Sequence, residues 1–574
     1  NTTGTFNTAV GKYALSSNTT ANDNTAVGYD SLQGNTTGAS NTAVGRDSLR
    51  VNTTGANNTA MGKDALKANT TGENNVAIGD GAGKSNTTGG RNIAIGRDAY
   101  DASDTENDNI AIGHHAMTTN TAGGQYNIAI GNYAGDALTS ADNSVLVGYN
   151  AGTAINTGGS NTAIGHESMK ATTSGINSTA VGRLALQANT TGQENVAVGM
   201  QSLQANTTGN QNTAVGNYAL FTNTTATGNT AVGERALRLN TTGASNVAVG
   251  RYALTANTTA AGNTGVGFQA LAYNTTGASN TAVGKDALYT NVTGANNTAI
   301  GKDSLKVNLG SSNTAVGLNS LLANTTAANN TVVGKDAGRA ITTGGNNVVI
   351  GMEAAYAMTT GADCVIIGYG SSATHTGTVH DIVAIGSRAM QSNTTGVDIV
   401  AVGKLALGAN TTGVNSTAVG YEALLSNTTA DNNIGIGFRA LKGNETGTRN
   451  IAIGSNANDQ TTDEDDNLAI GIDAMTANVA GGEKNVGIGN YALDALTSAD
   501  DCTGIGYNAL TSMTSGQQCT ALGKDAGDTM VGNANSMCLG HNAQPSSNNV
   551  DNEITFGDAN VTALRSADQS IAAL

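Results

Sequence analysis

The chain has 574 residues, of which 77 are glycine and only 3% are aromatic, and it contains no tryptophan. So few large side chains argue against the three or four globular domains that the length would otherwise suggest. The formal net charge of −16 argues against a nucleic-acid binder, which would need a basic surface. No continuous apolar run is long enough to span a membrane.

A word of the type Asn-Thr-Ala-Val-Gly recurs along the whole chain, mostly at intervals of about 17 residues, which is a repeat period typical of stacked units. We number each repeat so that the last glycine of this word is position 5, and this glycine occurs 33 times between Gly11 and Gly557. The period is too short for helical repeats of about 33–47 residues and too long for a heptad. It predicts an all-β parallel β-solenoid (β-roll) of about 33 coils, each coil being one turn.

The first four positions of a coil predict a short strand. Position 1 is usually asparagine, as in Asn24, Asn41 and Asn58, and predicts a ladder of side-chain amides along the stack. Positions 2 and 4 are mostly Thr, Val or Ile, so we expect Val27 and Val44 to stack on the buried face of the strand. Alanine at position 3 is then expected to face the other way.

The rest of the coil predicts corners and a second apolar patch. The glycines at position 5, such as Gly28, Gly45 and Gly62, are expected at a corner with positive φ. Ala-Leu at positions 8 and 9 predicts a patch that closes over the strand, and Asn-Thr-Thr-Gly from position 12 predicts a turn. A coil with so few apolar residues must be stabilised by stacking. The alanines at positions 3 and 8 are expected to stay exposed and to let three chains pack as an elongated homotrimer.

The period slips at four places. The intervals that end at Gly131, Gly386 and Gly489 are each one residue longer than the others, and the interval that ends at Gly317 is one residue shorter. We interpret these slips as adjustments of a turn. The sequence around Gly131 recurs almost unchanged around Gly489, which indicates that the array grew by copying blocks of coils.

Two pairs of histidines interrupt the pattern. His375 and His380 lie in the segment that departs most from the repeat, but two histidines at this spacing are weak support for zinc. A variant turn is therefore favoured there, and no metal site is predicted. His114 and His115 occupy positions 6 and 7 and are expected to face solvent.

Acidic residues and cysteines are the remaining candidates for chemistry. The acidic segments 101–108 and 463–466 match no calcium-binding pattern and are expected to be solvated loops. Cys502 and Cys519 occupy position 1 of adjacent coils, and we expect buried, stacked free thiols because parallel side chains point poorly at each other. The Asn-Thr-Thr words are formal N-glycosylation acceptors, although a repeated turn word accounts for their number. No nucleophile–base pair, phosphate loop or paired carboxylates are recognisable, so neither catalysis nor a cofactor is predicted.

The repeated word resembles the head repeats of trimeric autotransporter adhesins of the YadA type. In that family, Asn-Ser-Val-Ala-Ile-Gly-like words build a left-handed parallel β-roll within a trimer. Those repeats are shorter than the repeat of this chain. The resemblance implies a trimeric solenoid on the outside of a cell or particle.

The segment from Asn552 to Arg565 resembles the junction in phage tail fibres that precedes an endosialidase-type intramolecular chaperone. The chain stops at Ser570–Leu574, about where that chaperone cuts itself off, so the resemblance implies a processed homotrimeric fibre. We therefore expect a solenoid shaft over residues 1–544 and a trimeric tip over residues 545–574, which begins at the only proline, Pro545.

Together these observations predict an extracellular structural and adhesive fibre, the shaft of a phage tail fibre. Its expected partners are further copies of itself and a glycan or protein on the host cell surface, with neither nucleic acid nor membrane insertion. A bacterial surface trimeric adhesin or extracellular filament subunit is the alternative. A polysaccharide-degrading tailspike is a third possibility, which would need a cleft with two carboxylates.

Overall fold

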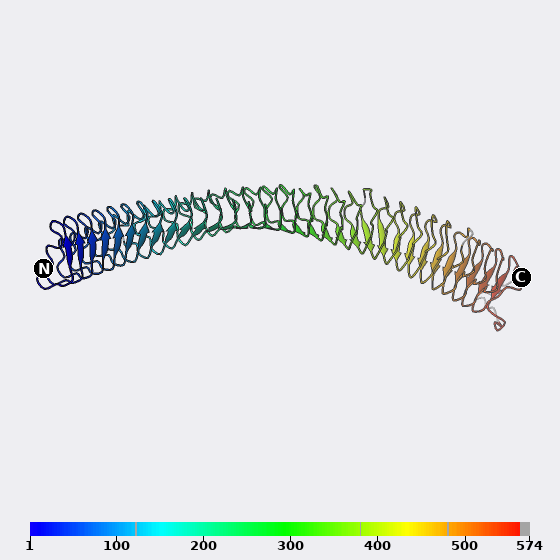
Figure 1. The fold of residues 1–574 in the computed structure, drawn as a ribbon. Helices are drawn as coiled ribbons and strands as arrows, with labels where there is room; N and C mark the ends of the chain where they lie inside the picture. Colours follow the sequence, from blue (N-terminus) through cyan, green and yellow to red (C-terminus); the bar gives the residue numbers. More distant parts are fainter. Residues whose placement is uncertain (121–122, 379, 479–480, 563–574) are drawn as a thin grey trace, which may run out of the picture. The chain divides into compact units, whose positions relative to one another are not determined.

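The computed structural model describes residues 1–120, 123–378, 380–478 and 481–562. The chain divides into two units, Asn1–Ala295 and Asn296–Leu574. The described residues contain no helix, and each unit is a parallel β-solenoid in which every coil contributes one strand (Figure 1). The predicted fold class is therefore confirmed for the solenoid, with a spacing of about 17 residues between strands.

The strands are short and regular. The first unit contains β1 (Thr8–Val10), β2 (Thr25–Val27), β3 (Thr42–Val44), β4 (Thr59–Met61), β5 (Val76–Ile78), β6 (Ile93–Ile95), β7 (Ile110–Ile112), β8 (Ile128–Ile130), β9 (Val145–Val147), β10 (Thr162–Ile164), β11 (Thr179–Val181), β12 (Val196–Val198), β13 (Thr213–Val215), β14 (Thr230–Val232), β15 (Val247–Val249), β16 (Thr264–Val266) and β17 (Thr281–Val283). The second unit contains β18 (Thr298–Ile300), β19 (Thr314–Val316), β20 (Thr331–Val333), β21 (Val348–Ile350), β22 (Val365–Ile367), β23 (Ile382–Ile385), β24 (Ile399–Val402), β25 (Thr417–Val419), β26 (Ile434–Ile436), β27 (Ile451–Ile453), β28 (Leu468–Ile470), β29 (Val486–Ile488), β30 (Thr503–Ile505), β31 (Thr520–Leu522), β32 (Met537–Leu539) and β33 (Ile554–Phe556).

Within each unit, consecutive strands pair in parallel, with equivalent positions of the repeat opposite each other. Thr25 pairs with Thr42, for example, and Val27 pairs with Val44. The slips of the period leave this register intact, because Ile110 still pairs with Ile128 across one of the longer intervals. The last strand, β33, also pairs in register with β32, although it follows Pro545. The extra or missing residues are therefore absorbed outside the strands.

The predicted orientation of the strands is wrong. Ala26 and Ala43 at position 3 are completely buried, whereas Val27 and Val44 at position 4 lie on the outer surface of the coil. The valines do form a ladder, but it faces away from the core. The alanines at position 8 are also inside, as Ala219 is. The expectation that positions 3 and 8 present an exposed alanine face is thus overturned.

The narrow interior of the coil explains why alanine lies inside. Leucine at position 9 is buried and reaches across the coil toward position 3. Where position 3 is glycine, as in Gly265, an added Cβ would lie 3.3 Å from Cγ of Leu254. In most coils a methyl group therefore fills the space opposite the leucine, and a larger side chain there needs room elsewhere in the coil, as Val332 has beside Gly338.

A larger residue enters the core where position 9 is glycine. Leu146 occupies position 3 and is fully buried, and position 9 is glycine both in the preceding coil, at Gly135, and in its own coil, at Gly152. A Cβ at Gly135 would lie 2.9 Å from Leu146, and one at Gly152 would lie 2.8 Å from it. The side chains at positions 3 and 9 thus fill the same interior space, so a large residue at one position is accompanied by a small residue at the other.

The glycine at position 5 is required for two reasons. Gly28, Gly45 and Gly62 have φ of +141°, +137° and +139°, a conformation that L side chains rarely adopt. In addition, a Cβ at Gly28 would lie 2.4 Å from the carbonyl oxygen of Gly45 in the next coil. The predicted glycine corner is present, and neighbouring coils approach each other closely there.

Asparagine at position 1 links both the coil and the stack. Oδ1 of Asn24 accepts a hydrogen bond of 2.9 Å from the backbone N–H of Asn41, whose Oδ1 accepts the same bond from Asn58. Nδ2 of Asn24 donates to the carbonyl of Gly38, 3.0 Å away, at the far end of its own coil. These buried amides therefore satisfy backbone groups that the short strands leave unpaired.

A second amide ladder runs through position 12, where only a turn was predicted. Nδ2 of Asn52 donates to Oδ1 of Asn35 at 2.9 Å, and Nδ2 of Asn69 donates to Oδ1 of Asn52 at 2.8 Å. The sequence signal was the regularity of asparagine at this position. These are asparagines of the Asn-Thr-Thr words, and because Asn35, Asn52 and Asn69 are buried and their Nδ2 atoms are bonded, the folded coil gives a glycan-transferring enzyme no access to them.

Candidate interaction surfaces

The outer face of the sheet carries a stripe of Thr, Val and Ile side chains from positions 2 and 4, which we call the β-stripe. Its apolar members include Ile164, Val232, Val247, Val249, Ile350 and Ile453, each between 36% and 39% exposed. Each strand continues the stripe of its neighbour, because the coils are in register. Contiguous apolar surface of this kind is typical of a contact with another macromolecule.

Positions 6 and 7 carry a row of aromatic rings in four consecutive coils of the first unit. His115 stacks on Tyr133 with ring centroids 5.7 Å apart, and Tyr149 stacks on His166 at 5.4 Å. Tyr133 and Tyr149 meet edge to face at 6.2 Å and so join the two stacks. The histidine pair predicted to face solvent, His114 and His115, is half-buried within this row, with centroids 4.2 Å apart. The row offers flat apolar surface with polar edges to a ligand.

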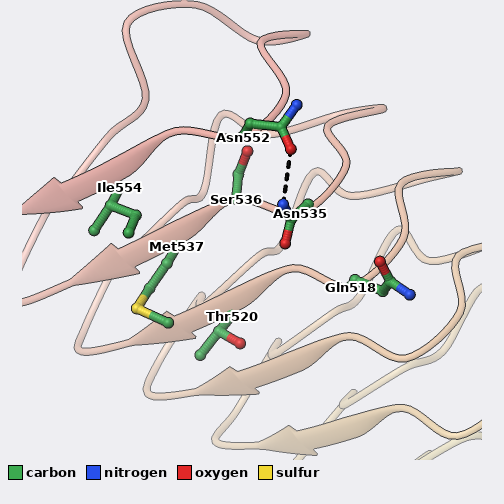
Figure 2. A pocket seen from close by; sticks show the side chains of 7 residues that line it. All are labelled: Gln518, Thr520, Asn535, Ser536, Met537, Asn552 and Ile554. Carbon is green, nitrogen blue, oxygen red and sulfur yellow. Dashed lines mark hydrogen bonds between the residues drawn. The ribbon is translucent and has the colours of Figure 1, made fainter.

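A small hollow lies on the outer surface of the last coils (Figure 2). Side chains of position 2, such as Met537 and Ile554, form one wall, and position 17 forms the other. Nδ2 of Asn535 donates to Oδ1 of Asn552 at 2.7 Å along that second wall. The hollow is the furrow between two ladders and brings together no titratable side chains.

The acidic segment 101–108 contains a buried carboxylate, so the expectation of a solvated loop is wrong for Glu106. Its Oε2 accepts hydrogen bonds from the hydroxyl of Ser103 and the backbone N–H of Asp104 and Thr105, at 2.8–2.9 Å. Its Oε1 accepts a bond of 3.0 Å from the backbone N–H of Gly123, in the coil that is one residue longer. The carboxylate therefore ties this longer turn to the preceding coil.

Glu464 repeats this arrangement and corrects the same expectation for the segment 463–466. Its Oε2 accepts bonds from Thr461, Thr462 and Asp463, and its Oε1 accepts a bond of 3.0 Å from the N–H of Gly481. Burial alone would raise the pKa of Glu464, but the hydrogen bonds outweigh burial and the pKa lies below its usual value. Both glutamates replace the glycine at position 15 in the coil before a long interval.

The structure separates the two histidines of the irregular segment. His375 is completely buried at position 12, where it replaces an asparagine of the second ladder. Its Nδ1 lies 3.2 Å from Oγ of Ser372 and 3.2 Å from Nδ2 of Asn393, and burial lowers its pKa to about 4. His380 is exposed instead, with Nδ1 3.2 Å from Oδ2 of Asp381. The two histidines therefore do not form one site.

Cys502 and Cys519 are buried free thiols at position 1 of adjacent coils. Sγ of Cys519 lies 3.1 Å from the carbonyl oxygen of Asn533, and Sγ of Cys502 lies 3.8 Å from that of Gly516. The contact with Cys519, followed by burial, raises the pKa of Cys502. The thiols thus occupy the place of the ladder amides, with weaker hydrogen bonds.

The described residues contain no helix that could cross a membrane. The chain matches no protein-family model, and a search of curated protein sequences gives no significant match. The prediction that the chain is not an enzyme stays a prediction. The β-stripe and the aromatic row are the two surfaces that we consider as binding surfaces for a partner.

Proposed function

We propose that this chain is the shaft of an extracellular fibre that attaches a phage tail to its host cell. The observation that carries the proposal is the β-stripe, which every coil of each unit extends. A solenoid that buried all its β-branched residues would have no such surface. Copies of the chain that pack through their stripes form a homotrimer, and the apolar contact is repeated at each coil.

The stripe replaces the alanine face as the basis for the trimer. Alanine is inside the coil, so it contributes nothing to a contact between chains. Valine, isoleucine and threonine at positions 2 and 4 have stiff side chains that lose little entropy when they are covered. The proposed assembly therefore keeps its number of chains but uses the opposite face of the strand.

The aromatic row supports attachment to a glycan. Ring faces and polar atoms lie along one surface at His115, Tyr133 and Tyr149. Nucleic acid is a less suitable partner, because the chain carries a net negative charge. In a trimer such a row is present three times, so weak individual contacts add up through multivalency. Host attachment by this chain would thus rest on avidity.

Antibodies raised against the chain test where it functions. On negatively stained material from a culture of the source, labelling of virion tails is the expected result. Labelling of the bacterial envelope without virions would support a bacterial trimeric adhesin and would contradict the phage fibre. A glycan array probed with the intact chain then tests attachment, and the substitution Tyr149→Ala should reduce any signal that depends on the aromatic row.

A further inference from the structure

Position 17 forms a column of side chains beside the strands, and two of its aspartates are paired with an arginine of the preceding coil. Arg91 donates to both carboxylate oxygens of Asp108 at 2.6 and 2.7 Å. Arg449 does the same with Asp466 at 2.6 and 2.9 Å. Residues of equivalent position lie directly above each other in this fold, so the column places an opposite charge over each of these aspartates.

Another stretch of the column stacks aspartates on one another. Asp363, Asp381 and Asp398 occupy position 17 of three successive coils. Asp363 accepts a hydrogen bond of 3.0 Å from Nδ2 of Asn346 in the preceding coil. In the described part of the chain, no lysine or arginine forms an ion pair with Asp381 or Asp398. Two carboxylates are therefore stacked without a cation between them, an arrangement that destabilises a sheet.

The long coil brings a histidine to the same place. The interval that ends at Gly386 contains one residue more than the usual interval, and its backbone is anchored by a parallel bridge between Ala362 and His380. The ring of His380, Asp381 beside it and Asp398 from the next coil each offer one ligand atom, and these atoms all lie within 4.8 Å of one another. All three side chains are exposed.

We propose that His380, Asp381 and Asp398 bind a divalent transition-metal ion, with Zn²⁺ as the best match. Imidazole and carboxylate are ligands of Zn²⁺, and three protein ligands with water in the fourth place form a recognised coordination. Ligand atoms around a tetrahedral zinc ion lie about 3.3 Å apart. Nδ1 of His380 and Oδ2 of Asp381 already lie 3.2 Å apart, so only the carboxylate of Asp398 has to move closer.

The two carboxylates leave the backbone in the same way. Asp381 and Asp398 have φ of +59° and +58°, the left-handed conformation that position 17 also adopts in other coils, as at Arg91. An ion held between them neutralises the like charges and joins two adjacent coils at the irregular turn. Binding of the ion only to the folded state stabilises that state.

The test is equilibrium dialysis of the intact chain against Zn²⁺, with the bound metal measured by mass spectrometry. We expect one ion per chain, affinity weakened about tenfold or more by His380→Ala and by the isosteric Asp398→Asn, and unchanged affinity in His541→Ala, which alters another exposed histidine. Zn²⁺ should also raise the unfolding temperature of the unmodified chain but not that of the two variants.

Absence of bound Zn²⁺, or equal binding by the unmodified chain and both variants, would overturn the proposal. A parallel dialysis against Ca²⁺ distinguishes the proposed site from one in which only carboxylates bind the ion. Calcium bound equally well by the His380→Ala variant, without zinc binding by the unmodified chain, would show that histidine is not a ligand and would likewise contradict the proposed site.

Discussion

Single side chains in this fold act through ladders, so the effect of a substitution depends on its position in the coil. Asparagine at position 1 is the clearest case. Its amide serves a backbone N–H of the next coil and a carbonyl of its own coil, and both groups are buried. An apolar residue at this position would leave two backbone groups without partners.

Asn229→Ala is therefore expected to destabilise the chain by about 2 kcal/mol or more, because buried groups that lose their hydrogen bonds pay the full cost of desolvation. Oδ1 of Asn229 accepts from the N–H of Asn246, and Nδ2 donates to Gly243, both at 2.9 Å. Urea unfolding followed by circular dichroism measures the loss. Gln193→Ala, at an exposed position, is the matched control, and equal stability of the two variants would contradict the role of the ladder.

His375→Asn should increase stability more at low pH than at neutral pH. The folded-state pKa of His375 is lowered to about 4, while its unfolded value is near 6.5, so the unfolded state binds a proton first as the pH falls. The native chain then loses about 1.4 kcal/mol per pH unit between these two values, and the variant does not.

Unfolding free energies measured between pH 7 and pH 4.5 check this expectation. The gap between the His375→Asn variant and the native chain should widen steadily as the pH falls. A gap that stays constant would mean that His375 does not carry the effect, and His541→Asn serves as the control for loss of an exposed histidine.

At the scale of the strand and turn, two of the three long coils, those that end at Gly131 and Gly489, are tied to a buried carboxylate in the coil before them. Glu464→Gln should destabilise the second unit, because an amide cannot accept hydrogen bonds at both of its ends. Since the pKa of Glu464 is lowered in the folded state, its contribution is fully present above the ordinary value of 4.5 and is lost as the pH falls through the folded value.

Thermal unfolding of the native chain and the Glu464→Gln variant from pH 7 to pH 3 tests this dependence. The difference in unfolding temperature is expected to stay constant down to about pH 5 and to shrink below it. Glu445→Gln changes an exposed glutamate in the same unit and should have little effect at any pH. A difference that grows with acidity would contradict the assignment.

The sequence predicts the coil, the strand position and the glycine corner correctly. It does not decide which face of the strand points into the core, and the expectation for that face is wrong. Alternation shows that positions 2 and 4 share a face, and hydrophobicity alone placed that face inside. The decisive quantity is volume: a leucine at position 9 leaves little more than the room of a methyl group at position 3 of the next coil, unless position 9 of that coil is glycine, as at Gly338 beside Val332. The large residue Leu146 at position 3 is accompanied by the small residue Gly152 at position 9, and the sequence shows this compensation once the two positions are known to be in contact.

The interaction surfaces were less predictable than the fold. The second asparagine ladder has a clear signal in its regularity, and Glu106 could be found because it replaces a glycine before a long interval. The trio of His380, Asp381 and Asp398 has no such signal. Its members come together only because the coils stack in register across an irregular turn.

At the scale of the whole molecule, the proposed role of the β-stripe is to hold several chains together in one assembly. Val249→Glu places a charge on the stripe at a residue that is 37% exposed, so the isolated coil tolerates it. Burial of that charge between chains would be costly. We expect the variant to keep the circular dichroism spectrum of the native chain but to lose its assembly.

Ser245→Glu is the matched control, because it adds the same charge at the last position of the preceding coil, which is exposed and lies outside the stripe. It should leave the assembly intact. Light scattering coupled to size-exclusion chromatography compares the two variants. Loss of assembly in both, or in neither, would contradict the assignment of the stripe as the contact between chains.

The mass of the native chain in solution tests the central proposal most directly. Sedimentation equilibrium of the intact protein is expected to give three times the chain mass of 57.0 kDa, with no dissociation at micromolar concentration. A species of a single chain mass at that concentration would contradict the proposal that these solenoids assemble through their outward-facing β-branched residues.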